Sequence, residues 1–276
     1  MLLRRFVLAC CGVVALCAGV PARASDRPWD GQVVSICDDQ NEWPPYTYFQ
    51  RVNGAKSAQI VGYSVDIIKE IFAARGIAFK LTLLPWARCL DEVASGKKYQ
   101  MALNLVGTAA REQTYWMSKT YYSIRDYYFY SRKHYPQGLP IKSMADLHNY
   151  KVCGILNYDH SNMGFKPGEI DQSATSYGML ITKMHLNRCT LFISQYEGML
   201  GFSFIGQSYF DDPDLGYAPV PGFRPASFKM AISRKMAQGE QLRDLIDAEL
   251  AKMSASGRLA TLWQHYLPPA PHQPVN

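Results

Sequence analysis

Strand-like and helix-like patterns of apolar residues alternate from residue 32 to residue 105. Short apolar runs that suit β-strands occur at 32–37, 77–84 and 100–105. Segments with apolar residues at helical spacing lie between them, at 64–76 and 87–95. Because strand and helix alternate, we expect this part of the chain to form an α/β domain with a largely parallel sheet.

The helix expected at 64–76 carries the clearest boundary signals. Its apolar face consists of Val65, Ile68, Ile71 and Phe72. Ser64 is expected to cap the first turn with its hydroxyl group, and Asp66 suits the positive end of the helix dipole. Gly76 is expected to stop the helix.

A second alternating set follows further along the chain. Helices expected at 143–149 and 176–187 alternate with strands expected at 150–156 and 189–194. Two helical stripes then follow, formed first by Leu242, Leu245, Ile246, Leu250 and Met253, and next by Leu259, Leu262, Trp263 and Tyr266. Two α/β units of about 100 residues each predict two lobes.

The N-terminus has the pattern of a secretory signal peptide. Two arginines precede an apolar run over 6–20, and an Ala-Arg-Ala sequence predicts cleavage before Ser25. The apolar run, about 15 residues long, is shorter than the ~20 residues that a membrane-spanning helix needs. Residues 1–24 are therefore expected to be removed, and the remaining protein is expected in the periplasm.

The charge of the exported chain is too mild to indicate a nucleic-acid partner. The signal peptide holds three of the 29 basic residues and none of the 23 acidic ones, so a net charge of +3 remains. The 18 tyrosines suit either a core or a cleft lined with aromatic rings.

Four cysteines remain after the signal peptide is removed: Cys37, Cys89, Cys153 and Cys189. An even number in an oxidising compartment predicts two disulfides, for which three connectivities exist. If each lobe closes its own pair, the pairs are Cys37–Cys89 and Cys153–Cys189. No C-x-x-C sequence occurs, which argues against a zinc site or a thioredoxin-like redox site.

Motifs for catalysis are missing from the chain. It contains no G-x-G-x-x-G, P-loop or H-E-x-x-H sequence, and the sequence around Ser203 misses the G-x-S-x-G pattern by one residue. The histidines lack metal-ligand spacing. We therefore expect neither a cofactor nor a metal.

Several stretches together resemble one known family. They are "WPPYTY", "VGYSVDIIKEIFAARG", "LPWARCLDEVASGKKYQMALNLVGTAAREQTYWMSKTYYS" and "FKMAISRKMAQGEQLRDLIDAELAKMSASGRLATLWQHYL". In this order they resemble the bacterial extracellular solute-binding proteins of family 3. The resemblance implies a two-lobed, type II periplasmic binding protein fold, with a ligand cleft between lobes that two hinge segments join.

The resemblance also implies how the chain is divided. Residues 25–127 would form the first part of lobe 1, residues 128–228 lobe 2, and residues 229–268 the returning part of lobe 1. Residues 269–276 would form a frayed tail. The protein would be a monomer that delivers a small carboxylate-bearing solute, such as an amino acid, to an ABC transporter or to a membrane sensor.

Site residues carry over from the family pattern position by position. Arg111 falls on the T-x-x-R turn whose arginine binds the ligand carboxylate, with Thr108 at its start; the alternative for Arg111 is a solvated charge. The other matched positions are Trp43 and Tyr46 as rings over the ligand, Trp86, Asn104 on the cleft floor, and Tyr158 and Asp159 on a loop of lobe 2. For Tyr46 and Trp86 the alternative role is core packing.

Gln195 marks a departure from the family pattern. Amino-acid binders of the family place an aspartate there, and a neutral amide cannot pair with an ammonium group as an aspartate does. An amino acid would then need its charge partner from Asp159 or Glu197.

Two further functions remain open at this stage. The same fold hosts a cyclohexadienyl dehydratase, a lyase that would need a general acid such as Glu42, Asp159 or Glu197. An accessory protein with a degenerate cleft would bind no small solute.

Overall fold

The computed structural model describes residues 32–156 and 163–267. The predicted signal peptide, the tail at 269–276, and the candidate residues Tyr158 and Asp159 lie outside these described residues. Within the described part, no helix combines the length and the apolar composition that a membrane span requires.

The first sheet has six strands and belongs to lobe 1. Its strands are β1 (Val33–Asp39), β4 (Ala78–Leu84), β5 (Met101–Val106), β6 (Tyr115–Met117), β7 (Tyr122–Ile124) and β13 (Ala226–Ser233). Their order is β4-β1-β5-β13-β6, and β7 also pairs with β13. The helices of this lobe are α1 (Tyr63–Ala73), α2 (Trp86–Ser95), α3 (Ala109–Thr114), α6 (Gly239–Ala255) and α7 (Arg258–Tyr266).

The second sheet has five strands and belongs to lobe 2. Its strands, in sheet order, are β10 (Asp171–Ala174), β9 (Val152–Ile155), β11 (Leu191–Gln195), β8 (Asp126–Ser131) and β12 (Leu215–Pro219). Its α-helices are α4 (Tyr177–His185) and α5 (Tyr196–Gly201). Short 3-10 helices are η1 (Met144–Asn149), η3 (Phe202–Ile205) and η4 (Tyr209–Asp211).

The strands predicted in residues 32–105 pair in parallel, as expected, but strands from later in the chain make both sheets mixed. β1, β4 and β5 run parallel, but β13 runs antiparallel to β5, β6 and β7. In lobe 2, β9, β10 and β11 run parallel, while β8 is antiparallel to β11 and β12. The antiparallel strands arise where the chain crosses between lobes and pairs with the sheet that it enters.

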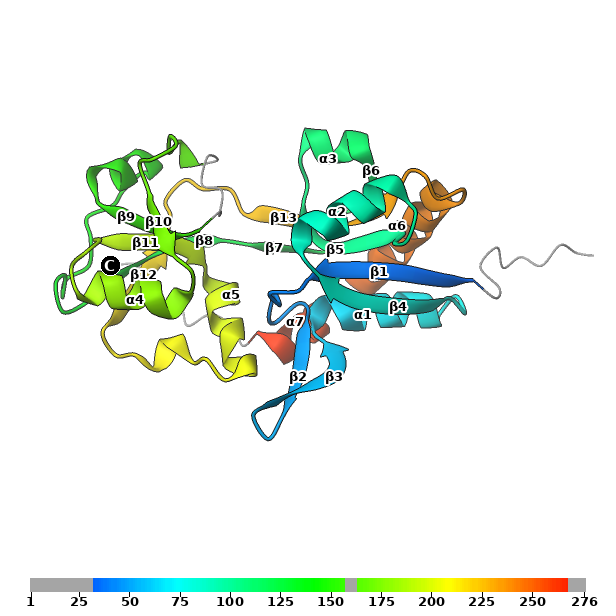
Figure 1. Cartoon of the computed structure of the whole chain (residues 1–276), viewed down its shortest axis with the longest axis horizontal. Coiled ribbons are helices and arrows are strands. Elements are labelled where there is room, and N and C mark those ends of the chain that lie inside the picture. Colours follow the sequence, from blue (N-terminus) through cyan, green and yellow to red (C-terminus); the bar gives the residue numbers. More distant parts are fainter. Residues whose placement is uncertain (1–31, 157–162, 268–276) are drawn as a thin grey trace, which may run out of the picture.

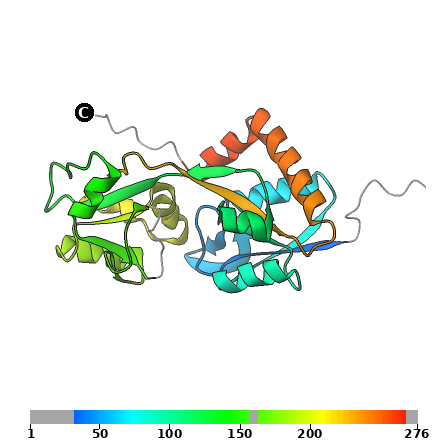
Figure 2. The ribbon, with the colours of Figure 1, turned by 90° about the horizontal axis from the view of Figure 1, so that it is seen from above.

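Two segments carry the chain between the lobes (Figure 1). Arg125 separates β7 of lobe 1 from β8 of lobe 2, and residues 220–225 lead back from β12 to β13. Because β7 pairs with β13 and β8 pairs with β12, the two crossings run side by side, as Figure 2 shows from above. The C-terminal helices α6 and α7 therefore belong to lobe 1.

Helix α1 buries the apolar face that the sequence predicts, but its start differs. Val65, Ile68, Ile71 and Phe72 all lie in the core of lobe 1. The helix is capped at Gly62, and a β-carbon there would lie 2.3 Å from the carbonyl oxygen of Tyr46. Ser64 is therefore not the N-cap; it lies inside the first turn, and its hydroxyl group is buried in a side-chain network.

Each lobe contains one disulfide, with the predicted partners. Cys37 at the end of β1 is bonded to Cys89 of α2, with 5.7 Å between their Cα atoms. Cys153 of β9 is bonded to Cys189, just before β11, with 5.9 Å between the Cα atoms. In the chain-entropy model, closing loops of this size stabilises the folded state by about 4 kcal/mol each.

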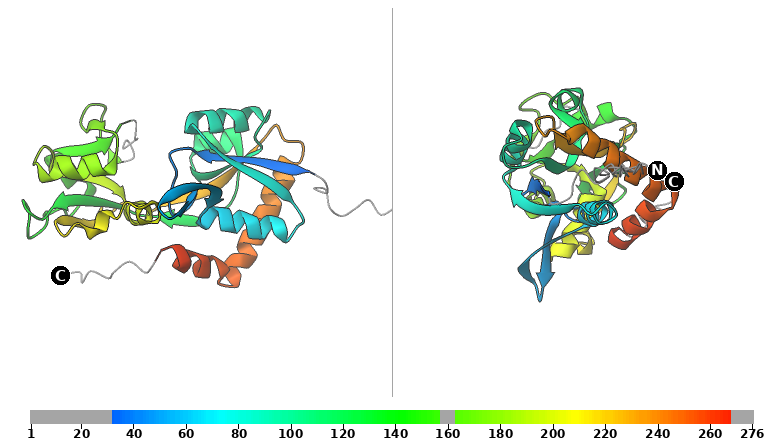
Figure 3. Two further views of the ribbon diagram at one scale, coloured as in Figure 1. Left: turned by 60° about the horizontal axis from the view of Figure 1, so that its bottom comes forward. Right: turned by 90° about the vertical axis from the view of Figure 1, so that its right-hand side faces the viewer.

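A hairpin that the sequence analysis did not predict projects from lobe 1. It consists of β2 (Tyr48–Val52) and β3 (Ala55–Val61), which form a separate two-stranded sheet (Figure 1, Figure 3). Glu42, in the loop after β1, ties the hairpin to this loop by accepting hydrogen bonds from both terminal nitrogens of the Arg51 guanidinium group. Its side chains are mostly exposed, so the hairpin adds little to the core.

Candidate binding site between the lobes

The two lobes turn the carboxyl ends of their parallel strands toward each other. The loop after β1 reaches α5, which follows β11 (Figure 1). A β-carbon at Gly198 would lie 3.4 Å from the Trp43 ring, and one at Gly201 would lie 2.4 Å from the carbonyl oxygen of Pro44. In α/β sheets, ligands bind beyond the carboxyl ends of the strands, so this facing edge is the candidate site.

Arg111 lies on the turn that follows β5 at this edge. Its side chain is half-buried, and burial lowers the pKa of its guanidinium group. Nη1 donates a hydrogen bond to the carbonyl oxygen of Val106 at 2.8 Å. Among the described residues, no acidic group lies within ion-pair distance of Arg111, so its charge is available to an anion.

Thr108 shapes the same turn. It is the N-cap of α3, and its Oγ1 accepts a hydrogen bond from the Arg111 backbone N–H at 3.3 Å. The side chain of Lys229 lies against Gly107, but its ammonium group is 2.8 Å from Glu112. Lys229 is thus already paired, whereas Arg111 is not.

Tyr46 lies in the core of lobe 1, which corrects its expected place over the ligand. Its relative exposure is 0%, and its ring stacks on Tyr122 with 4.1 Å between centroids. Trp43 stacks on the outer side of Tyr46 at 6.0 Å and is only partly buried. Of the two rings, Trp43 is the one that reaches the facing edge.

Trp86 begins α2 directly after β4. It is partly buried and packs against the cluster that contains Cys37 and Cys89. In this structure Trp86 therefore packs against the core of lobe 1, which was the alternative to a role in stacking on the ligand.

Asn104 does not present its amide to the space between the lobes, contrary to expectation. It is 8% exposed and has a φ of 59° where the β5–β13 register shifts. Its Nδ2 donates to Asp38 Oδ2 at 2.5 Å and to Thr47 Oγ1 at 2.8 Å. Its Oδ1 accepts hydrogen bonds from three hydroxyl groups, those of Ser64 (2.6 Å), Tyr121 (2.9 Å) and Tyr122 (2.9 Å).

Asp38 is a buried acid that the sequence analysis passed over. It is 2% exposed, and burial raises its pKa to about 7 against the opposing effect of hydrogen bonds from Thr47, Asp39 and Asn104. With Asn104 it ties the ends of β1 and β5 together behind the facing edge. This network holds the Val106–Arg111 turn at a defined place.

Gln195, at the end of β11, is hydrogen-bonded to a buried acid of lobe 2, Asp126. Its Nε2 donates to Asp126 Oδ1 at 2.7 Å, because the two residues are directly opposite in the β11–β8 register. Asp126 is 4% exposed, and burial raises its pKa to about 6 despite the hydrogen bond from Gln195. The acid missing at position 195 thus has a neighbour on the adjacent strand.

Glu197 lies in the first turn of α5 at the same edge. Burial raises its pKa to about 7, against hydrogen bonds from its own N–H and from the N–H of Arg125. Its Oε2 atom is buried without a hydrogen-bond partner among the described residues, as are Nε1 of Trp43 and the hydroxyl group of Tyr46. These three atoms lie on both sides of the contact between α5 and the loop after β1.

Known proteins of one family match nearly all of the described chain. The model of the bacterial extracellular solute-binding proteins, family 3, covers residues 36–269. The chain belongs to this family. No curated protein matches it in sequence.

Solved structures show the same two-lobed type II fold. The arginine-, lysine-, histidine-binding protein ArtJ from Geobacillus stearothermophilus has 17% identity and a TM-score of 0.62, over 86% of this chain and 95% of that one. The Streptococcus pneumoniae ABC transporter substrate-binding protein AbpA, bound to L-arginine, has 20% identity and a TM-score of 0.61, over 84% and 93%. A histidine kinase sensor domain has 15% identity and a TM-score of 0.64, over 86% and 96%.

Membership of this solute-binding family makes the space between the lobes the place for a solute. Arg111, Trp43 and Gln195 lie at its edges, while Tyr46 and Asn104 lie behind it. Asp126, which was not predicted, has a signal in the sequence. It sits with Arg125 inside an aromatic, strand-like run, where a buried charge needs a reason.

Glu42 is a structural residue in this solute-binding protein. Burial favours its neutral form, but hydrogen bonds from Arg51 and from the Phe49 N–H outweigh burial and lower the pKa. A carboxyl group that is paired and ionised in this way is a poor proton donor. Glu42 is therefore removed from the candidate general acids.

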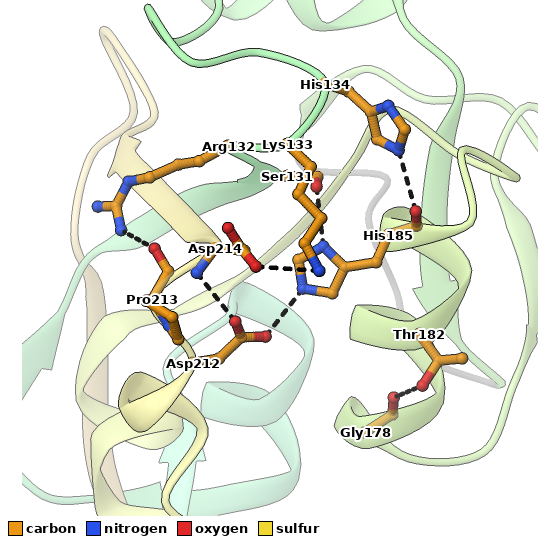
Figure 4. A network of polar contacts seen from close by, with 10 residues as sticks. All are labelled: Ser131, Arg132, Lys133, His134, Gly178, Thr182, His185, Asp212, Pro213 and Asp214. Carbon is orange, nitrogen blue, oxygen red and sulfur yellow. Dashed lines mark hydrogen bonds and ion pairs between the residues drawn. The ribbon is translucent and has the colours of Figure 1, made fainter.

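A serine–histidine–aspartate arrangement in lobe 2 is also structural (Figure 4). His185 Nδ1 lies 2.8 Å from Ser131 Oγ, and Nε2 lies 2.8 Å from Asp212 Oδ2. Ser131 is fully buried, so no substrate reaches its hydroxyl group. The network joins the end of β8 to α4 and to the segment before β12.

The part of the chain that the structure describes also holds no cluster of three or more His, Cys, Asp or Glu side chains suited to a metal ion.

Proposed function

We propose that the protein captures a small carboxylate-bearing solute between its lobes, with Arg111 as the anchor of the carboxylate. The observation that carries this proposal is the state of Arg111 itself. Its side chain is half-buried, makes a single hydrogen bond to the carbonyl oxygen of Val106, and forms no ion pair with an acid among the described residues. A desolvated, unpaired cation costs free energy, and an anion from the solute would offset that cost.

The chemistry of arginine favours a carboxylate as that anion. A planar guanidinium group donates two parallel hydrogen bonds to the two oxygens of a carboxylate, which an ammonium group cannot do. Trp43 offers an aromatic ring at the same edge, next to α5. Closure of the lobes around the solute would then bring Gln195 and Glu197 toward it from lobe 2.

The solute is proposed to be an amino acid or a related compound, handed to a membrane transporter or reported to a sensor. Similar structures include an amino acid ABC transporter substrate-binding protein and a histidine kinase sensor domain. The predicted signal peptide and the two disulfides both suit an exported protein.

Calorimetry on the mature protein tests the role of Arg111. L-amino acids and simple carboxylates are titrated into the wild type, Arg111→Ala and the control Arg88→Ala. Arg88 is an exposed arginine on the same lobe, so its variant changes the net charge equally. We expect Arg111→Ala to weaken binding by on the order of 100-fold, which corresponds to ~3 kcal/mol, with little effect of Arg88→Ala.

Unchanged affinity in Arg111→Ala would overturn the proposed anchor. Equal weakening in Arg88→Ala would show that net charge, and not a built contact, controls binding.

One observation favours an enzyme as the alternative. Glu197 has a pKa of about 7 because it is buried, and a carboxyl group of that pKa can donate a proton at neutral pH. A cyclohexadienyl dehydratase would consume its substrate, whereas a binding protein returns it intact. Incubation with prephenate, followed by chromatography, separates the two; product that disappears in Glu197→Gln would establish the enzyme.

A further inference from the structure

One short helical stretch of lobe 2 lies on the side of that lobe that faces β2 and α7 (Figure 1). α5 ends at Gly201 and η3 begins at Phe202, and both residues have helical backbone angles, so residues 196–205 form one continuous stretch. Gly206, with a φ of 83°, ends it. The sequence around Ser203, which misses the hydrolase pattern by one residue, thus forms the second half of this stretch.

The stretch has two apolar faces, one for each lobe. Met199 is buried in the core of lobe 2, and Phe202 packs against the same core. Leu200 packs instead against the core of lobe 1. Because residues three or four positions apart share a face of a helix, Phe204 lies on the same side as Leu200. The stretch therefore follows β11 of lobe 2 along the chain, yet lobe 1 covers one of its faces.

Phe204 packs against two elements of lobe 1. Its ring centroid is 5.8 Å from that of Tyr48 in β2 and 6.2 Å from that of Tyr266 in α7, distances at which aromatic rings attract each other. Both tyrosines are buried, and the hydroxyl group of Tyr266 donates a hydrogen bond to Asp66 of α1. Phe204 itself stays 38% exposed. Lobe 1 thus offers a fixed surface, on which Phe204 rests without being enclosed.

The contact begins beside a crossing segment and extends away from it. Glu197, in the first turn of α5, accepts a hydrogen bond from the backbone N–H of Arg125, which lies in the crossing. Phe204 follows seven residues later, about 10 Å further along a helix. Attraction between packed side chains is lost over short distances. Rotation of the lobes away from each other at the crossing therefore has to break the contact of Phe204.

We propose that residues 196–205 are a latch that holds the two lobes together in the free protein. The inference concerns the protein without solute, so it goes beyond the proposed function and does not depend on Arg111. Leu200 and Phe204 are only partly covered, which makes the latch a weak contact that can open to admit a solute. By limiting how far the lobes open, the latch leaves a smaller rotation for the solute to drive.

Small-angle scattering and hydrogen exchange on the free protein test the latch. After extensive dialysis, the mature wild type, Phe204→Ala, Leu200→Ala and the control Met179→Ala are compared without added solute. Met179 is 43% exposed on α4, so its variant also removes a partly exposed apolar side chain from a helix of lobe 2. Scattering gives the radius of gyration, and exchange of backbone N–H groups shows which elements stay folded.

We expect Phe204→Ala and Leu200→Ala to have a larger radius of gyration than the wild type. In Phe204→Ala, the backbone N–H groups of β2 and of the last turn of α7 should exchange about tenfold faster, because the ring no longer covers them. β5 and β11, at the centre of the two sheets, should keep the protection of the wild type. Met179→Ala should keep the wild-type radius.

A wild-type radius in either Phe204→Ala or Leu200→Ala would overturn the latch. A larger radius together with lost protection in β5 or β11 would overturn it as well, because a lobe would then unfold instead of rotating. An equal increase in Met179→Ala would show that the loss of any such apolar side chain expands the protein. None of these results bears on the proposed function, which calorimetry of Arg111→Ala decides separately.

Discussion

At the scale of single residues, the polar side chains near the facing edge differ in how many of their donors and acceptors have hydrogen-bond partners. Asn104 uses every donor and acceptor of its amide, so it stabilises lobe 1 and is closed to a solute. Arg111 and Glu197 instead keep polar atoms without partners among the described residues. This contrast separates the groups that maintain the fold from those that can bind.

Replacement of Asn104 by alanine should strongly destabilise lobe 1. The variant leaves Asp38 and three hydroxyl groups short of a partner, so we expect the free energy of unfolding to fall by ~3 kcal/mol or more. Urea denaturation measures it. Asn53→Ala is the control, because Asn53 also has a positive φ, of 52°, but is exposed at the hairpin tip. Equal losses in both variants would mean that backbone strain alone, about 1–2 kcal/mol, explains the result.

Glu197 should make the stability of the wild type depend on pH. Folding raises the pKa of Glu197 from 4.5 to about 7, so the folded state binds a proton more tightly than the unfolded state. Its stabilising effect is full below pH 4.5 and is lost as the pH rises through 7. Glu197→Gln should therefore gain stability relative to the wild type between pH 5 and pH 8, by about 2 kcal/mol.

Denaturation at pH 5, 6, 7 and 8 measures this difference. Asp171→Asn is the control, since hydrogen bonds from Lys183 and Ser173 lower the pKa of Asp171 to about 2, far below the window. Asp171→Asn should change the free energy of unfolding by the same amount at each pH, so its dependence on pH should match that of the wild type. A wild-type slope that persists in Glu197→Gln would contradict the assignment.

At the scale of elements, α5 and the loop after β1 determine how closely the lobes approach. Gly198 and Gly201 are both buried, and Gly201 has an ordinary helical φ of −61°. Glycine is therefore needed at position 201 so that the loop after β1 can approach α5 closely, and not because the backbone there has a special conformation. The loop can pack against α5 only because no β-carbon stands between them.

Gly201→Ala should separate α5 from this loop. The new β-carbon would lie 2.4 Å from the Pro44 carbonyl oxygen and 2.5 Å from Cδ of Pro45, so α5 and this loop must move apart. We expect a larger radius of gyration in small-angle scattering and a stability loss of about 1–3 kcal/mol. In the control Gly178→Ala the nearest atoms are 4.0 Å away, so it should change neither quantity. An unaltered radius in Gly201→Ala would show that the loop adjusts on its own.

At the scale of the whole molecule, two adjacent segments of the described chain join two lobes that have separate cores. Arg125 and residues 220–225 are the crossings, and each lobe keeps its own sheet and disulfide. Two adjacent crossings are the arrangement that hinge closure requires, and the packing of α5 and Phe204 against lobe 1 must adjust when the lobes rotate.

Addition of a solute that binds by calorimetry should make the protein more compact. We expect small-angle scattering to give a smaller radius of gyration at saturation, because a solute held by both lobes favours the closed arrangement. Arg111→Ala at the same solute concentration is the control and should keep the radius of the free protein. A saturated wild type with the radius of the free protein would exclude closure.

Some parts of this protein follow from its sequence alone. The buried face of α1, the two disulfide pairs and the family fold were all predicted, because apolar periodicity and motifs are read along the chain and the division into two lobes assigns one cysteine pair to each. Arg111 was named from its motif and lies in α3, directly after β5; its role as the carboxylate anchor stays a prediction. The mixed strand directions and the β2–β3 hairpin were not predicted, since they depend on where the chain crosses and what it then meets.

Only the tertiary structure decided which polar side chains have all their hydrogen-bond partners within the protein and which keep donors, acceptors or charge for a ligand. Whether Asn104 faces a solute depends on five partners from four other parts of the chain, and Tyr46 is buried because Tyr122 stacks on it. Asp126 joins Gln195 across 69 residues of sequence, through a strand register that no local pattern encodes. Burial and pairing are properties of the folded environment, and they determine here where charge remains for a ligand.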